Sequence, residues 1–392
     1  MGNLIKAFPD RFRRITNSGA YNPQIDGLRF IAIMQVAIYH AVLRGDRAIN
    51  SNSTPSEGWI SYFPNGAAGV ELFFFISGYI IAYPFFRETA FKYRDFYLRR
   101  LTRLEPPYFL VLLLLFIGAV LTGYSPSSAH SFNKSDVPLY QSLFASLVYS
   151  HGLLIGAPPK LNPPLWSLEI EIQFYLAAPF LILAYKKIKS NNLRILLGIL
   201  VIIITIASQP ALARDHFTRY FVISHAFAFL MGIVASDLSS RNDLFSLMGR
   251  YRFDWSTLFG IILLTFSSSL FYVTKDNTMA ALILLLRATS IALIYIGVSR
   301  GNISRSVFSN PWVTLIGGAC YSIYLVHVPV IQLGSSIIFK LIHPTSLIMS
   351  WAVSAIFLVP LSVISGLVFY VFIERPCMDR NWPRRVWHFV GR

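Results

Sequence analysis

Charged residues are scarce in this 392-residue sequence. They make up 13% of the chain, against 55% hydrophobic and 15% aromatic residues, and the mean hydropathy is +0.55. Soluble domains carry about 25% charged residues, so the composition excludes an ordinary water-soluble protein. It is typical of a protein that crosses a membrane many times.

Cysteines, cleavage signals and linkers are also missing or rare. The two cysteines, Cys320 and Cys377, lack metal-ligand spacing, which argues against a disulfide framework and a metal site. Residues 1–24 contain no uninterrupted apolar run and no small-residue cleavage site, so we interpret them as a retained basic tail rather than a signal peptide. We therefore predict one membrane domain at 25–376, between cytoplasmic tails at 1–24 and 377–392.

Long apolar runs recur through the rest of the chain. Each approaches the roughly 20 residues that cross a bilayer. We predict an all-α integral membrane protein, a polytopic bundle of about ten transmembrane helices, with spans at 25–44, 67–86, 105–123, 165–185, 193–210, 217–236, 255–273, 279–298, 311–338 and 349–373. The segment 139–157 is more polar than these spans and is an eleventh candidate.

The formal net charge of +16 helps to orient the chain. In a soluble protein it would suggest a nucleic-acid partner, but Lys and Arg also collect on cytoplasmic loops and attract anionic lipids, so we predict membrane lipids and no nucleic acid. If 139–157 does not cross the membrane, most Lys and Arg residues fall on one side. If it does cross, they are divided almost equally between the two sides. We therefore predict a re-entrant or surface-lying outer element there, with both termini cytoplasmic.

Ionisable residues inside the spans are costly, so each is a functional hypothesis. The predicted topology brings one histidine and three carboxylates to one depth in the outer half of the membrane: His40, Glu71, Glu169 and Glu171. A histidine beside a carboxylate is the usual arrangement for a general base. The alternative is that these side chains are hydrogen-bonded pairs that hold helices together.

Three arginines are predicted on the cytoplasmic side. Arg100 and Arg103 are three residues apart, so on a helix they face the same way and could bind an anionic group together. Arg29 shares their layer and lies roughly 16 Å from His40 along one helix. The alternatives are an ordinary positive-inside loop and a snorkelling arginine. Arg287 and His327 are also deep, and are candidates to stabilise developing negative charge.

Six motifs, taken in order, resemble the membrane acyltransferase 3 family of bacterial glycan O-acyltransferases. They are "IDGLRFIAIMQVAIYHA", "GVELFFFISGYII", "YLRRLTRLEPPYF", "NPPLWSLEIEIQFYL", "YSIYLVHVP" and "FIERP", and they cover roughly residues 24–376. The resemblance implies an Arg, ten residues and an essential catalytic His, here Arg29 and His40. It also implies an Arg-x-x-Arg pair associated with acyl-CoA, matched by Arg100 and Arg103.

The acidic motif positions match in part. Glu71 stands where many members have Asp, and Glu171 and Gln173 match the fourth-span motif, but Ile172 replaces its second acid. We take Glu71 and Glu171 as catalytic candidates with His40. Supporting residues are Asp26, Trp166 and Gln173 from the motifs, with Arg287 and His327.

Together these features predict transfer of an acyl group across a bacterial inner membrane. The expected donor is cytoplasmic acetyl-CoA as a substrate, with no permanently bound cofactor, and the acceptor is a hydroxyl of an extracytoplasmic or lipid-linked sugar. His40 would act as base, oriented by Glu71 or Glu171, or be transiently acylated. The chain resembles members without a C-terminal esterase-like domain, so if the reaction needs that domain, a separate periplasmic protein must supply it. The alternative is a transporter or flippase of an anionic or lipid-linked sugar.

Overall fold

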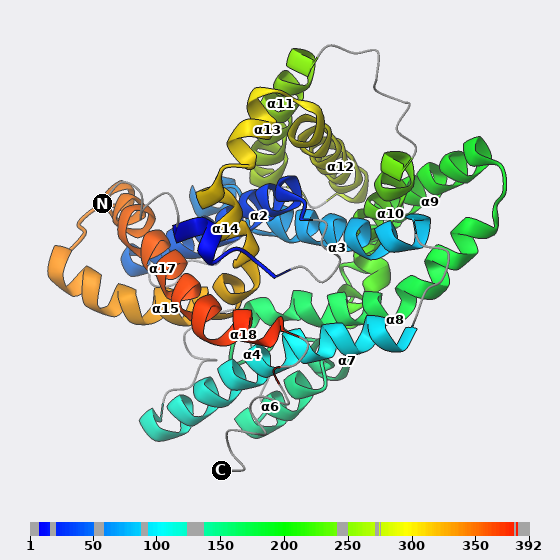
Figure 1. Ribbon diagram of the computed structural model, residues 1–392. Coiled ribbons are helices and arrows are strands. Elements are labelled where there is room, and N and C mark those ends of the chain that lie inside the picture. Colours follow the sequence, from blue (N-terminus) through cyan, green and yellow to red (C-terminus); the bar gives the residue numbers. More distant parts are fainter. Residues whose placement is uncertain are drawn as a thin grey trace.

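All regular secondary structure in the described part of the chain is helical, as predicted (Figure 1). The computed structural model describes residues 8–15, 21–50, 59–87, 93–123, 137–240, 250–270, 274, 276–379 and 382. The long helices are α2 (Pro23–Ile49), α3 (Ala67–Arg87), α4 (Tyr93–Thr122), α8 (Trp166–Lys187), α9 (Asn191–Leu212), α10 (Ala226–Ser240), α11 (Arg250–Ser269), α12 (Asn277–Arg300), α15 (Cys320–Ile342) and α17 (Val359–Phe369). The short ones are α6 (Leu139–Leu147), α7 (His151–Ile155), α13 (Ile303–Phe308), α14 (Pro311–Gly318), α16 (Leu347–Val353) and α18 (Arg375–Cys377).

Nine helices in the described chain are long and apolar enough to cross a membrane. They correspond to nine of the ten predicted spans, with shifted ends. The predicted span at 255–273 is the exception. Its last residues, 271–273, lie outside the described residues, and the first turns of α11 hold Arg250, Arg252 and Asp254, which lower the mean hydropathy of the helix. The all-α polytopic membrane fold is confirmed. In Figure 1, α11, α12 and α13 form one edge of the bundle, and α4 and α6 lie at the opposite edge.

The predicted ninth span, at 311–338, is divided into two helices in the structure. α14 ends at Gly318, and α15 begins at Cys320. The break lets α14 lie against the start of α2, where a Cβ atom on Gly317 would come within 1.8 Å of the Asp26 carbonyl oxygen. Such a close approach of two helices needs glycine. The apolar crossing helix is therefore α15 by itself.

α3 lies between α2 and α10 (Figure 1). Cβ atoms on Gly78 of α3 and Gly232 of α10 would each come within 2.1 Å of a backbone oxygen of the other helix. On the α2 side, a Cβ atom on Gly69 would lie 2.6 Å from the carbonyl oxygen of Ala32. These close contacts fix α3 against both neighbours, and they place its first turns beside the middle of α2.

The last span is a continuous helical stretch that contains two π-helical segments. It runs from α16 through η5 (Ser354–Leu358), α17 and η6 (Tyr370–Glu374) to α18. A π-helical turn changes the direction of the side chains that follow it and is often found at functional sites. Here η6 ends at Glu374, whose side chain is completely buried in the bundle.

The predicted outer element at 139–157 consists of the short helices α6 and α7, with nine and five residues. Neither is long enough to cross a bilayer. The Tyr149 hydroxyl donates to Glu105 Oε2 of α4 over 3.1 Å, and the Tyr108 hydroxyl of α4 donates to the Ser146 carbonyl over 2.8 Å. The element therefore folds back along α4, an arrangement that fits a re-entrant segment.

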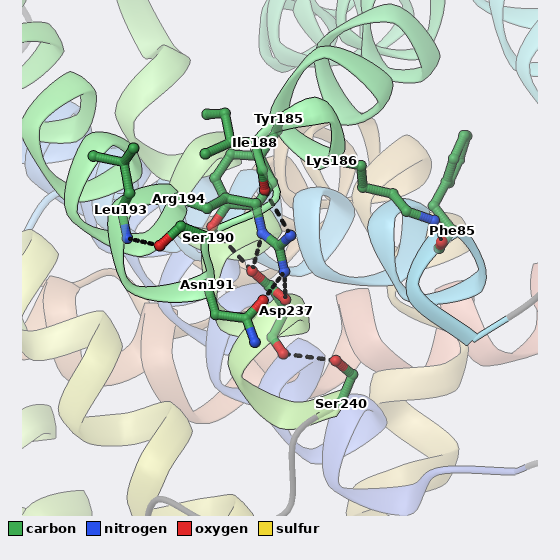
Figure 2. Close-up of polar contacts among 10 residues, drawn as sticks. All are labelled: Phe85, Tyr185, Lys186, Ile188, Ser190, Asn191, Leu193, Arg194, Asp237 and Ser240. Atoms are coloured by element: carbon green, nitrogen blue, oxygen red, sulfur yellow. Dashed lines mark hydrogen bonds and ion pairs between the residues drawn. The ribbon is translucent and has the colours of Figure 1, made fainter.

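A bidentate ion pair joins the α8–α9 hairpin to the end of α10 (Figure 2). Arg194 Nε and Nη2 donate to the two carboxylate oxygens of Asp237 over 2.9 and 3.0 Å. Arg194 Nη1 also donates to the Ile188 carbonyl, and the Tyr185 hydroxyl donates to Asp237. The Asp237 side chain is 1% exposed. This contact holds three consecutive helices together at one end of the bundle.

Asp237→Asn should therefore destabilise the protein by about 2 kcal/mol, because charged hydrogen bonds to a buried carboxylate are lost. The change is measurable by SDS titration of the purified protein. Asp10→Asn is the matched control, because Asp10 is exposed and its pair with Arg13 should contribute less than about 1 kcal/mol. Equal stability of the two variants would contradict the prediction.

Candidate active site

His40 of α2 contacts a second histidine, His327 of α15. His40 Nδ1 lies 2.9 Å from the Val36 carbonyl oxygen and 3.2 Å from His327 Nε2. His327 Nδ1 lies 2.7 Å from the Tyr324 carbonyl oxygen. His327 is completely buried, whereas His40 is partly exposed. The structure thus brings together two predicted site residues that are far apart in the sequence.

These hydrogen bonds assign the tautomers of both rings. A carbonyl oxygen can only accept, so Nδ1 carries the proton in each neutral imidazole. His327 Nε2 then has a lone pair, and the single proton on His40 Nδ1 is shared between this nitrogen and the Val36 carbonyl oxygen. The lone pair of His40 lies on Nε2, which has no hydrogen-bond partner in the described part of the chain. His40 is therefore arranged to take up a proton at Nε2 while His327 holds its other nitrogen.

Glu71, predicted to orient His40, is paired instead with Arg287. Arg287 Nη1 donates to Glu71 Oε1 over 3.0 Å, and the two side chains are 0% and 5% exposed. Gly69 meets Ala32, eight residues before His40, and α3 then continues away from His40. Glu71 therefore lies farther from His40 along α2 than Gly69, whose own contacts are with Ala32 and Val36. Within the described residues, a histidine takes the place predicted for the carboxylate.

Glu171, the other predicted partner of His40, belongs to a different group. It accepts hydrogen bonds from the hydroxyls of Ser77 and Tyr175. The Arg100 guanidinium lies over the Tyr175 ring, 4.9 Å from its centroid, where its charge acts on Glu171. Ser77 is the middle residue of α3. Glu171 and Arg100 therefore meet beside the middle of α3, and Arg100 lies within helix α4, at the start of its apolar stretch.

Arg103 binds Glu374, a residue that was not among the predicted site residues. Arg103 Nη2 donates to Glu374 Oε1 over 2.9 Å. Glu374 Oε2 accepts from the backbone nitrogen and the hydroxyl of Ser322, over 3.2 and 2.6 Å. An acid at the end of an apolar span is the sequence signal that could have identified Glu374. Arg100 and Arg103 thus have different partners, although they share one face of α4.

Arg29 is held by Asp26, a predicted supporting residue that is completely buried. Arg29 Nη1 donates to Asp26 Oδ1 over 2.7 Å, and Arg14 Nη2 lies 3.6 Å from the same oxygen. The Cys320 sulfur lies in the electrostatic field of Arg29 and also of Arg103. The Asp26–Arg29 pair therefore lies near the Arg103–Glu374 pair.

We call the whole group the arginine cluster: Arg14, Arg29, Arg100 and Arg103, with the carboxylates of Asp26, Glu171 and Glu374. Four cations face three anions, so the group carries an excess of positive charge. Guanidinium groups bind phosphates through paired hydrogen bonds. The cluster is thus able to bind a phosphorylated ligand, and α2 connects it to His40.

Trp166 and Gln173 hold the segment before α10 against α8. The Gln173 side chain donates to the Tyr220 carbonyl and accepts from the Val222 nitrogen, each over 2.9 Å. The Trp166 ring lies 5.4 Å from the His225 ring. In the described chain, the hydrogen bonds of Gln173 and the ring contacts of Trp166 involve neither His40 nor the arginine cluster.

The remaining buried carboxylate of the prediction and the two cysteines lie outside these groups. Glu169, predicted at the depth of His40, accepts from the Gly152 nitrogen at the start of α7 over 2.8 Å. Cys320 and Cys377 are buried free thiols. Among the described residues, no three His, Cys, Asp or Glu side chains come together in a way that could hold a metal ion.

Comparisons with known proteins identify acyltransferases as similar to this chain. Residues 22–371 match the model of an acyltransferase domain. A Staphylococcus aureus protein provisionally named an O-acetyltransferase is 27% identical over 345 residues, which are 80% of this chain and 51% of that protein. The peptidoglycan O-acetyltransferase OatA of Listeria monocytogenes is 28% identical over 46% of this chain and 28% of its own length. A Bacillus subtilis protein, provisionally named a peptidoglycan O-acetyltransferase, is 30% identical over 45% of this chain and 26% of its own.

The Staphylococcus relative is matched over about half of its length. No solved structure matches the chain.

Proposed function

Because the chain belongs to the acyltransferase family matched over residues 22–371, we propose that it transfers an acyl group from acyl-coenzyme A to a hydroxyl group of a glycan. The relatives named as O-acetyltransferases support acetyl as the group and acetyl-CoA as the donor. Peptidoglycan, which appears in two of those names, or a lipid-linked sugar is the proposed acceptor. We place the protein in the bacterial cytoplasmic membrane, with both termini in the cytoplasm.

The observation that carries this proposal is that Nε2 of His40 has no hydrogen-bond partner among the residues that the structure describes. In the proposed reaction this nitrogen takes the proton of a sugar hydroxyl as the sugar oxygen attacks the thioester carbon. The tetrahedral intermediate then collapses, and its carbon–sulfur bond breaks. The proton on Nε2 passes to the departing coenzyme A thiolate. The products are an acylated sugar and coenzyme A, and His40 returns to its neutral form.

A second route uses the same atom in two steps. His40 Nε2 attacks the thioester carbon, the carbon–sulfur bond breaks, and coenzyme A leaves as a thiolate, so that an N-acyl-imidazolium is formed. The sugar oxygen then attacks the acyl carbon, the bond to Nε2 breaks, and the hydroxyl proton passes to the coenzyme A thiolate. Both routes leave Nδ1 protonated, with His327 Nε2 as its acceptor. Glu71 and Glu171, proposed from the sequence as catalytic partners, would act on either route only through groups that lie between them and His40.

We assign the donor phosphates to the arginine cluster. It contains Arg29, Arg100 and Arg103, the three arginines that the sequence suggests for phosphate binding. Roughly 16 Å of α2 separate Arg29 from His40. The narrow pantetheine arm of the donor would follow this helix and present its thioester to His40. The buried Glu71–Arg287 pair lies along the same stretch of the bundle, so it would form part of the wall of this path.

Purified protein in liposomes, given acetyl-CoA with a labelled acetyl group and a glycan acceptor, tests the function. We expect label on the glycan, with release of one coenzyme A for each acetyl group transferred. Movement of unlabelled glycan across the membrane without coenzyme A release would instead support a transporter. That result would overturn the proposal.

His327 is a positioning residue in this scheme, so its replacement should lower the rate of acyl transfer. His327→Leu should lower kcat about 10²-fold, because His40 Nδ1 loses its acceptor on α15 and keeps only the Val36 carbonyl of its own helix. The KM for acetyl-CoA should stay unchanged, because the arginine cluster is untouched. His327→Gln, whose side-chain oxygen can accept from Nδ1, should recover part of the rate. Equal rates for both variants would exclude the positioning role.

His225→Leu is the matched control for that experiment. His225 is another buried histidine with a carbonyl partner, the Arg219 oxygen at 3.1 Å, and it has no contact with His40. Its loss should affect stability without the specific fall in kcat. A similar fall in kcat in this variant would show that the effect at His327 is general.

A further inference from the structure

The N-terminal segment 8–15 is docked onto the bundle next to the arginine cluster. Arg375, in the first turn of α18, donates to the carbonyl oxygens of Arg11 and Arg13, over 2.9 and 3.4 Å. The Phe8 ring stacks on Trp312 of α14, with centroids 5.9 Å apart. Two elements from the other end of the chain thus hold this segment in place. A simple solvated tail would lack such contacts.

Because the segment is docked there, Arg14 lies next to the Asp26–Arg29 ion pair of the cluster. Its side chain is only 13% exposed, and its Nη2 lies 3.6 Å from Asp26 Oδ1. That oxygen already accepts from Arg29 over 2.7 Å. The Nε of Arg14 is buried and has no hydrogen-bond partner among the described residues. Arg14 is therefore a buried cation that shares Asp26 Oδ1 with Arg29, while Asp26 Oδ2 accepts no hydrogen bond from the described residues.

The surroundings of Arg14 contain more positive than negative charge and leave one of its hydrogen-bond donors without an acceptor among the described residues. Burial, together with the nearby charge of Arg29, lowers the pKa of Arg14 to about 10, so it remains protonated at neutral pH. Arg103 also acts on it as a like charge. A buried guanidinium is costly unless its donors are satisfied. A phosphate oxygen would supply the acceptor that Arg14 Nε lacks and would offset the positive excess of the cluster.

We propose that Arg14 binds a phosphate group of the acyl-CoA donor, so that the N-terminal segment forms part of the donor site. This inference rests on the proposed function. It assigns a binding role to a segment that the sequence pattern marks only as a basic tail. The segment would close the end of the cluster that lies away from His40, and Arg375 would act as the positioning residue that holds it there.

Binding of coenzyme A and of 3′-dephospho-coenzyme A to the purified full chain, measured by calorimetry, tests the proposal. Arg14→Gln should bind coenzyme A about tenfold more weakly, the effect expected for one lost charge-assisted contact. If Arg14 contacts the 3′-phosphate, the difference should vanish with the dephospho compound. If it contacts the pyrophosphate, the difference should persist. Either pattern supports the proposal.

Arg13→Gln is the matched control, because it removes the same charge from the next residue. The Arg13 side chain is 44% exposed and pairs with Asp10, outside the cluster. It should bind coenzyme A as the wild type does. The proposal fails if Arg14→Gln binds both compounds normally, or if Arg13→Gln loses as much affinity. Absence of binding by the wild type would instead contradict the proposed function.

A measurement on the wild-type protein avoids any folding defect. Phenylglyoxal modifies arginines, and mass spectrometry can follow each site, including Arg14, whose side chain remains 13% exposed. Coenzyme A should protect Arg14 from modification and leave Arg13 reactive. Protection of neither residue, in protein that binds coenzyme A, would overturn the proposal.

Discussion

Replacement of His40 by alanine is expected to lower acyl transfer about 10²–10⁴-fold, the usual contribution of a positioned general base. His40 Nε2 is the open nitrogen of the histidine pair, and its tautomer is set through Nδ1 by Val36 and His327. If His40 is acylated during the reaction, the loss should be larger still. The rate of labelled acetyl transfer to glycan measures the effect. Coenzyme A binding should be unaffected, because the arginine cluster is intact.

His216→Ala is a suitable control for the His40 variant, because His216 is exposed and lies in the segment between α9 and α10. It should keep full activity. Both variants should remain folded in the membrane, since alanine is favourable in a helix and α2 makes the same backbone hydrogen bonds. An active His40→Ala protein would remove this histidine from the mechanism.

Replacement of Arg287 by leucine is expected to cost about 3–5 kcal/mol of stability. It leaves the Glu71 carboxylate buried without its cationic partner. The pair joins α12 to α3, and both side chains are almost completely inaccessible. SDS titration of the purified protein would measure the loss. Wild-type stability in the Arg287→Leu variant would show that Glu71 is neutral or otherwise satisfied.

The double variant Glu71→Leu with Arg287→Leu separates stability from chemistry. Replacing a whole buried ion pair by apolar side chains is often neutral, so much of the lost stability should return. Recovery of activity as well would assign the pair to structure only. Recovery of stability without activity would show that the pair contributes to the reaction as well as to stability. A double variant as unstable as Arg287→Leu would contradict the pairing.

The sequence predicted the membrane fold well, because long apolar runs are a local property. Nine of the predicted spans appear as helices able to cross a membrane. The largest difference arises where tertiary contacts divided a predicted span. The span at 311–338 is broken because α14 turns to pack on α2 through Gly317, and no hydrophobic pattern records that contact.

The candidate residues were also visible in the sequence, because an ionisable side chain in an apolar run is conspicuous. His40, Arg29 and Glu71 stand out for that reason. Their partners could not be predicted in the same way. A shared depth in the membrane suggested a His–carboxylate pair, whereas the structure pairs His40 with His327 and Glu71 with Arg287.

The sequence by itself therefore determined that this is a helical membrane protein and which of its residues are costly to bury. Those properties follow from composition and from one-dimensional spacing along a helix. Only the tertiary structure decided the pairing of those residues, because contacts between distant helices depend on their rotation and register. It left Nε2 of His40 without a hydrogen bond from the described residues and paired Arg103 with Glu374. It also brought Arg14 from the N-terminal segment into the arginine cluster.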